Sequence, residues 1–454
     1  MTRSAYRLLA ASSLLLVTLA AALSRPQYGG TLHIALRVAP ASLDPAEIAP
    51  GESLARASVT ALMFDNLVAA DTIGHIQPAL ATSWQSDSGN QHWQFWIRRG
   101  VKFHDGSALT SDAVASSLRI SNPGWNVIAN GDSLTVETTV PTPYLLAELA
   151  LPRNAIAKRS TGASISGTGP FHVTDWQPGK RLTLAVQEDY WNGRPFLDGI
   201  VIDMGKGSRD QLISLDLGKT DLVELTPEQV HRAAAEGRRV LRSQPVVLIA
   251  LVFNKDRATP EEGHFREALS LSVDRGSMRN VLLQGQGEPA SGILPNWLTG
   301  YEFVFPSQFN LLRAQQLTSG LRQSPWTLAY DSADPLARLI ADRIVLNARD
   351  SGISIQTTAS AAADIRLVSV TLPSLNPQLA LTNFTALFGL PQPKFASSSI
   401  DDLFQAESAL LQTQRVIPLL RYPLAYAVSP AVRGYSLERS GVWQASDVWL
   451  AAKP

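Results

Sequence analysis

Bulky apolar residues alternate with polar ones over several stretches in the first half of the chain. A period of two residues is typical of strands that are buried on one face. The stretches that show it are residues 30–36, 76–103, 133–140 and 167–186. Between them, residues 54–67 and 112–120 are predicted to be helices. The first half therefore reads as β-rich, with short helices between the strands.

The second half carries longer apolar runs. Residues 245–253 are continuously apolar, which is expected for a strand that is covered on both faces. Residues 210–239 are predicted to be mostly helical. Residues 265–283 are predicted to form one helix, with its apolar side chains at helical spacing.

A strand, a helix and a second strand follow one another after residue 325. Residues 326–330 are predicted to be a strand, and Asp334 followed by Pro335 marks the start of a helix. Gly352 ends that helix, and residues 353–357 form the returning strand. Such a crossover implies a parallel strand pair, so the fold class is predicted to be α/β.

The first two dozen residues have the pattern of a targeting segment. Arg3 and Arg7 give a positive start, residues 8–19 are apolar, and Ala20–Ala22 offer small residues for cleavage. The apolar run is shorter than a membrane-spanning helix requires. Residues 1–24 are therefore predicted to be a cleavable signal peptide, and the mature chain is predicted to be periplasmic.

Composition narrows the possible functions. The 454 residues suggest two or three domains, and 39 basic residues balance 39 acidic ones, which disfavours nucleic-acid binding. Cysteine is absent, so disulfides, thiolate metal sites and a lipidated N-terminal Cys are excluded.

No motif points to catalysis or to a cofactor. Gly167-Thr168-Gly169 could be a phosphate cradle, but Pro170 and a strand follow it where a helix would be needed. His104 and Asp105 lie in a Phe-His-Asp-Gly sequence that is typical of a turn. The seven histidines show no paired short spacing, and no Gly-x-Ser-x-Gly elbow occurs. No catalytic residue, metal or cofactor is predicted, although a metal site built from distant residues stays open.

Several segments, taken in their order along the chain, resemble segments of one known protein family. The matching segments are residues 29–35, 42–45, 76–84, 100–106, 109–114, 167–171, 190–195, 253–254, 265–269, 273–275, 289–292, 416–419 and 432–435. Together they resemble the family 5 extracellular solute-binding proteins, which are the peptide and nickel receptors of ABC importers. The resemblance covers most of the mature chain.

This resemblance implies a two-lobed periplasmic binding protein-like fold (type II, cluster C) with an extra peripheral subdomain. Lobe I would comprise residues 25–60, 165–250 and 426–454, the peripheral subdomain residues 61–164, and lobe II residues 251–425. Hinge strands would lie near residues 245–253 and 420–427.

The resemblance also implies a function. The protein would close its two lobes on a small peptide-like solute and deliver it, as a monomer, to an inner-membrane ABC permease without making or breaking bonds. One alternative keeps the fold for a ligand sensor or chaperone that serves no permease. A secreted hydrolase is a weaker alternative, because the chain has no nucleophile motif.

Ligand-binding residues follow from the same resemblance. Those expected are Val38, Ala39 and Ser42 in lobe I, Ile249 and Leu251 near the hinge, and Trp297 and Phe388 in lobe II. The chain departs from the family at two places. Residues 120–133 are compressed, and residues 367–390 lack a counterpart to the Asp that holds the α-amino group in peptide receptors. The absence of this Asp would be consistent with a shorter ligand, with a neutral ligand or with no ligand.

Overall fold

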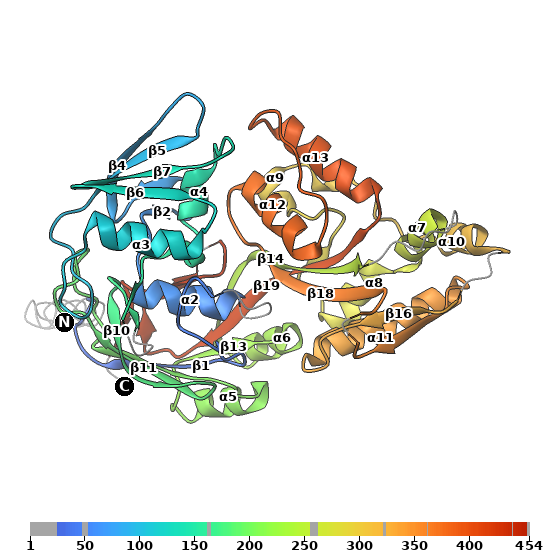
Figure 1. Ribbon diagram of the computed structural model, residues 1–454. Coiled ribbons are helices and arrows are strands. Elements are labelled where there is room, and N and C mark those ends of the chain that lie inside the picture. Colours follow the sequence, from blue (N-terminus) through green and yellow to red (C-terminus); the bar gives the residue numbers. More distant parts are fainter. Residues whose placement is uncertain are drawn as a thin grey trace, which may run out of the picture.

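The computed structural model describes residues 25–47, 53–160, 165–254, 262–320, 324–360, 362–437 and 439–451. Residues 1–24, predicted to be a signal peptide, lie outside this described part. Figure 1 shows two halves that are joined by long strands, with a smaller subdomain set above one of them.

An eleven-stranded mixed sheet runs through both halves. In spatial order its strands are β10 (Phe171–Gln177), β11 (Arg181–Val186), β12 (Gly199–Asp203), β1 (Thr31–Ala35), β13 (Leu222–Leu225), β19 (Val416–Val428), β14 (Arg239–Phe253), β18 (Ile365–Thr371), β16 (Trp326–Ala329) and β17 (Ile355–Thr358), while β15 (Glu288–Pro289) pairs with β19 outside this path. We call the half from β10 to β13 lobe I and the half from β18 to β17 lobe II. The predicted α/β class is confirmed.

Strands β14 and β19 connect the lobes. They are 15 and 13 residues long and pair antiparallel, from Arg239 opposite Val428 to Val252 opposite Val416. Residues 246–253 are all buried, as predicted for a strand covered on both faces. The pairing register shifts around Pro245, because proline has no N–H to donate to the ladder.

Helices cover both faces of the sheet (Figure 1). In lobe I, α2 (Ser53–Met63) packs on one face, and α5 (Ser208–Asp216) and α6 (Pro227–Ala235) pack on the other. In lobe II the helices are α7 (Glu262–Ser272), α8 (Arg275–Leu282), α9 (Asn296–Thr299), α10 (Leu311–Thr318), α11 (Pro335–Asp350), α12 (Pro377–Phe388) and α13 (Ile400–Gln412), with the short turn η2 (Glu302–Val304). These layers bury a separate core on each side of the sheet.

Two predictions about the helices needed changes. The single helix over residues 265–283 is wrong, because Asp274 accepts a hydrogen bond from the Ser277 backbone N–H and thereby starts a new helix, α8. Residues 210–239 are mostly helical as predicted, but they also contain strand β13. The predicted crossover after residue 325 is confirmed, since β16 and β17 are parallel and Asp334 caps α11.

A third core lies between residues 67 and 156. Its four-stranded sheet has the order β4 (Ala81–Ser86), β5 (His92–Ile97), β7 (Ser133–Glu137) and β6 (Asn126–Asn130). Around it lie β2 (Val68–Ala70), β3 (Ile76–Pro78), α3 (Ser111–Ser121), α4 (Leu145–Leu149) and η1 (Pro152–Asn154), with β8 (Lys158–Arg159) and β9 (Ile165–Ser166) at its end. The chain ends with β20 (Val432–Arg433), β21 (Ser436–Leu437), β22 (Trp443–Gln444) and β23 (Trp449–Leu450), which belong to lobe I.

The glycine-rich turn at residues 167–169 joins this third core to lobe I. The Thr168 hydroxyl donates to Asp65 Oδ2 at 2.9 Å, and the Trp191 indole N–H donates to the same oxygen at 2.8 Å. Tyr190 donates to Oδ1 at 2.8 Å. Burial raises the pKa of Asp65, while these three donors oppose the rise. Two separate sequence motifs thus meet at one buried carboxyl group and serve a structural role.

Candidate functional site

The strand directions bring the carboxyl ends of parallel strands from both lobes to the same place. In lobe I, β1 runs parallel to β12 and β13, and Leu225 at the end of β13 lies opposite Ala425 of the connecting strand β19. In lobe II, β16 runs parallel to β18, and Thr371 at the end of β18 lies opposite Val247 of β14. Ligands of open α/β sheets bind outside such carboxyl ends. We call this region the lobe junction and define it by residues 36–42, Glu224, Asp334, Ser369 and Tyr422.

Glu224 and Arg37 form the lobe I side of the junction. The Arg37 backbone N–H donates to Glu224 Oε2 at 2.7 Å, while the Arg37 Nε lies 3.7 Å from that oxygen. The Glu224 side chain is 15% exposed and that of Arg37 is 40% exposed. Burial raises the pKa of Glu224, and the charge and the N–H of Arg37 oppose the rise. The junction therefore holds a carboxyl group that is poorly solvated and only loosely paired.

Tyr422 on β19 connects the two sides. Ser369 of β18 and the charge of Asp334, which caps α11, both act on the pKa of its hydroxyl. Burial raises the pKa of Tyr422, and the charges of Asp334 and Glu224 add to this rise. Polar groups from β13, β18 and the start of α11 therefore all influence the pKa of this one hydroxyl at the hinge.

Aromatic side chains line the sheet beside Glu224. Tyr426 is the cross-strand partner of Glu224, and its ring meets that of Trp443 edge-on with 6.1 Å between centroids. The Tyr435 hydroxyl is buried and has no hydrogen-bond partner among the described residues. Burial raises the pKa of Tyr435, and Tyr426 and Glu224 both add to the rise. The Glu224 carboxyl group thus lies beside Tyr426, whose ring packs against Trp443.

The predicted ligand residues fall into two groups. Val38 and Ala39 are half-buried, follow Arg37 directly and pack on the lobe I core, so they lie at the junction. The Ser42 hydroxyl in the same loop accepts a hydrogen bond from the Asp44 N–H at 3.0 Å. The indole of Trp297 donates to the Pro245 carbonyl at 3.0 Å, which places it beside the hinge.

The other three predicted residues lie in the lobe II cores. Ile249 and Leu251 pack on one face of the sheet, and Phe388 packs on the other, stacked on Phe384. The structure does not bring these side chains to the junction, because strand alternation turns Ile249 and Leu251 into one apolar layer and Phe388 lies on the buried side of α12. Their role as ligand contacts stays a prediction.

Sequence reasoning did not select Arg37, Glu224, Ser369 or Tyr422. A signal for Glu224 was present, since it is the charged residue within the otherwise apolar strand Leu222–Leu225. Its partner Arg37 is 187 positions away, so that only the strand pairing reveals the contact.

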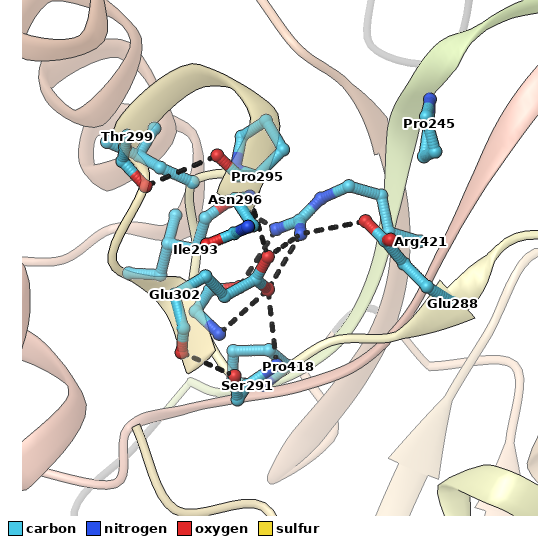
Figure 2. A network of polar contacts seen from close by, with 12 residues as sticks. Pro245, Glu288, Ser291, Ile293, Pro295, Asn296, Thr299, Glu302, Pro418 and Arg421 are labelled. Atoms are coloured by element: carbon cyan, nitrogen blue, oxygen red, sulfur yellow. Dashed lines mark hydrogen bonds and ion pairs between the residues drawn. The ribbon is translucent and has the colours of Figure 1, made fainter. Parts of the chain in front are cut away.

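A buried ionic network lies behind the hinge (Figure 2). Arg421 on β19 is 1% exposed and donates to both carboxylate oxygens of Glu302, at 2.7 and 2.8 Å, and to the carbonyls of Gly292 and Ile293, both at 3.0 Å. Glu302 also accepts from the backbone N–H of Gly292 at 3.1 Å and of Asn296 at 2.8 Å. The network fixes the loop over residues 291–302 to a connecting strand.

Glu407 of α13 completes the network from the helix side. Its Oε1 accepts from the backbone N–H groups of Ile293 at 2.6 Å and Leu294 at 2.9 Å, and its Oε2 accepts from the Tyr301 hydroxyl at 2.7 Å. Burial raises the pKa of Glu407 to about 7.

Replacing Glu407 by glutamine is expected to flatten the pH dependence of stability. The folded state keeps this proton up to about pH 7, whereas the unfolded state releases it near the ordinary pKa of 4.5. The contribution is therefore fully present below pH 4.5 and is lost as the pH rises through about 7. Between these limits the unfolding free energy of the wild type should fall by about 3 kcal/mol relative to that of Glu407→Gln.

Thermal unfolding of both proteins at about pH 5 and about pH 8 would measure this difference. Glu228→Gln, which removes an exposed acid, serves as the control and should follow the wild type. A Glu407→Gln protein that loses stability more steeply toward pH 8 than the wild type would contradict the expectation.

Among the described residues, no three His, Asp or Glu side chains gather in a way that could hold a metal ion. In the same part of the chain, no helix is long and apolar enough to cross a membrane.

Comparison with known proteins identifies relatives. The family model described as bacterial extracellular solute-binding proteins, family 5, matches residues 75–399. The nickel-binding protein NikA of Staphylococcus aureus is 26% identical over 243 residues, which are 50% of this chain and 49% of that protein. The probable D,D-dipeptide-binding periplasmic protein DdpA of Escherichia coli is 24% identical over 295 residues, 58% of this chain and 57% of its own. The matched part thus spans about half the length of these curated relatives.

A solved structure extends the likeness to nearly the whole chain. The dipeptide-binding protein of Pseudoalteromonas sp. SM9913, in complex with Met-Leu, superposes with a TM-score of 0.78 at 16% identity, covering 93% of this chain and 100% of that one. The predicted two-lobed fold is therefore confirmed.

Proposed function

The chain belongs to the family 5 extracellular solute-binding proteins of bacteria, and from this premise we propose that it captures a small peptide-like solute at the lobe junction and delivers it to an inner-membrane ABC permease. Residues 1–24 would direct export to the periplasm as a cleavable signal peptide. The mature chain would act as a monomer. Members of this family bind solutes, and no catalytic step is proposed.

The observation that carries the proposal is the meeting of both lobes at Tyr422. Groups from lobe I (Arg37 and Glu224) and from lobe II (Ser369 and Asp334) act on its hydroxyl. A solute held there can contact both lobes only when they are close together. Because a ligand shifts an equilibrium by its difference in affinity for the two states, such a solute favours the closed form. That form would be the one that a permease distinguishes.

The peptide-like nature of the cargo has two supports. One relative is named for D,D-dipeptides, and a solved neighbour holds Met-Leu. Another relative is named for nickel, yet the described residues offer no group of three His, Asp or Glu side chains for a bare metal ion. A small organic solute with polar ends therefore matches the junction better.

Native protein purified from its own periplasm is expected to carry a short peptide-like compound, which mass spectrometry of the denatured sample would identify. Adding that compound to stripped protein should reduce the radius of gyration in small-angle scattering, because closure brings the lobes together. A compound with no measurable binding is the control. A metabolite of another class would refute the peptide assignment, and an unchanged radius with a bound ligand would refute closure.

A further inference from the structure

We propose that Glu224 binds a positively charged amino group of the solute, so that the lobe I side of the junction selects ligands with a free ammonium. This inference rests on the proposed function in taking the lobe junction as the ligand site.

The first observation is that one carboxylate oxygen of Glu224 has no hydrogen-bond donor among the described residues. Its Oε2 accepts the Arg37 backbone N–H at 2.7 Å, whereas its Oε1 accepts no hydrogen bond from any residue that the structure describes. The nearest cationic atom, Arg37 Nε, is 3.7 Å away on a side chain that is 40% exposed. A carboxylate that is 15% exposed loses most of its hydration, and a loose pair replaces little of it.

Among the described residues some other buried acids, such as Asp221, also have one oxygen without a hydrogen bond, but three buried acids near the sheet do not. Both oxygens of Asp65 accept side-chain donors, from Tyr190 on one side and from Thr168 and Trp191 on the other. Glu302 and Glu407 likewise have hydrogen bonds to both oxygens. These three carboxyl groups are satisfied by the fold. Glu224 lies at the junction, and its free oxygen can receive a donor from outside.

The surroundings of Glu224 match an ammonium. Tyr426 is the cross-strand partner of Glu224, and the charge of Glu224 adds to the raised pKa of Tyr422, Tyr426 and Tyr435. Aromatic faces attract cations, and tyrosine hydroxyls can accept the remaining N–H groups of a primary amine. The Tyr435 hydroxyl, on a residue only 5% exposed, still has no partner among the described residues.

Other ligand charges match less well. An anion would be repelled by the carboxylate, and a metal ion would need several oxygen or nitrogen donors at once. A single carboxylate beside neutral rings suits one positive charge with its own hydrogen-bond donors. An amino group of a peptide-like solute has these properties.

The test offers the purified full chain three pools of compounds in equilibrium dialysis, with retained compounds identified by mass spectrometry. The first pool holds di- to tetrapeptides with free amino groups, the second holds the same peptides N-acetylated, and the third holds amino acids and polyamines. Glu224→Gln keeps the size and the acceptor for the Arg37 N–H but removes the charge. Glu228→Gln removes an exposed acid four positions away and is the matched control.

The wild type and Glu228→Gln are expected to retain free peptides and to lose their N-acetylated forms. Glu224→Gln should bind the retained compounds at least about 30-fold more weakly, as expected when one partner of a desolvated charge pair is neutralised. Its thermal unfolding should match that of the wild type. If the variant fails to fold, the comparison of free and acetylated peptides on the wild type decides the question.

Acetylated peptides retained as well as free ones, or a folded Glu224→Gln that binds like the wild type, would overturn the inference and leave peptide capture intact. If the wild type retains amines of the third pool, Glu224→Gln does not, and no peptide is retained, the inference is upheld and the peptide cargo is refuted. Retention from none of the pools would overturn both.

Discussion

Replacing Arg421 by methionine is expected to lower the free energy of unfolding by about 3–5 kcal/mol. Arg421 is almost fully buried and bonds both oxygens of Glu302 and two backbone carbonyls. Removing it leaves a buried carboxylate without its cation and two carbonyls without their donor. The cost comes mainly from these stranded groups, because the intact pair itself offsets little more than its own desolvation.

Chemical denaturation followed by circular dichroism would measure the effect. Arg433→Met removes an arginine from an exposed position on β20 of lobe I and is the matched control, with an expected change within about 0.5 kcal/mol. An Arg421→Met protein that is destabilised by less than about 1 kcal/mol would show that the network does not hold the loop in place.

The Arg421→Met substitution should also weaken ligand binding at the lobe junction. Arg421 and Tyr422 are neighbours on β19, and successive residues of a strand point to opposite faces. The network therefore anchors the strand from one face, while the Tyr422 side chain lies on the other. A loop released from Arg421 would leave that segment of β19 less fixed, so ligand binding should weaken together with stability.

The sequence predicted the features that local rules determine. The strand over residues 245–253 was predicted because a continuous apolar run needs cover on both faces, and residues 246–253 are buried. Helix α11 was predicted from the Asp334 cap and Pro335, which satisfy or remove orphan N–H groups of its first turn. The fold class followed from the crossover that these elements form.

Local rules failed where long-range pairing decides. Strand β13 has only four residues, and it is a strand because β1 and β19 flank it. The contact of Arg37 with Glu224 depends on the same pairing. The ligand residues expected from the resemblance stay predictions: the structure places Val38 and Ala39 at the lobe junction and Ile249 in a lobe II core.

Replacing Gly167 by alanine is expected to cost at least about 3 kcal/mol, at the upper end of the effect of overpacking. A Cβ at this position would lie 2.0 Å from the carbonyl oxygen of Met63 and 2.6 Å from the Phe64 ring. The turn cannot move away easily, because the Gly167 carbonyl accepts the His104 N–H at 2.9 Å and the Gly169 N–H donates to the Met63 carbonyl at 3.0 Å. Glycine is required here by close approach of two backbones.

Gly106→Ala is the matched control, because it changes a glycine of the other motif that has open space around its Cβ. Its φ of +83° makes alanine strained, which should cost about 1 kcal/mol. Comparing the unfolding midpoints of the two variants distinguishes the cost of a steric clash at Gly167 from the cost of a positive φ at Gly106. A Gly167→Ala protein as stable as Gly106→Ala would mean that the turn can move away from Met63 at little cost in stability.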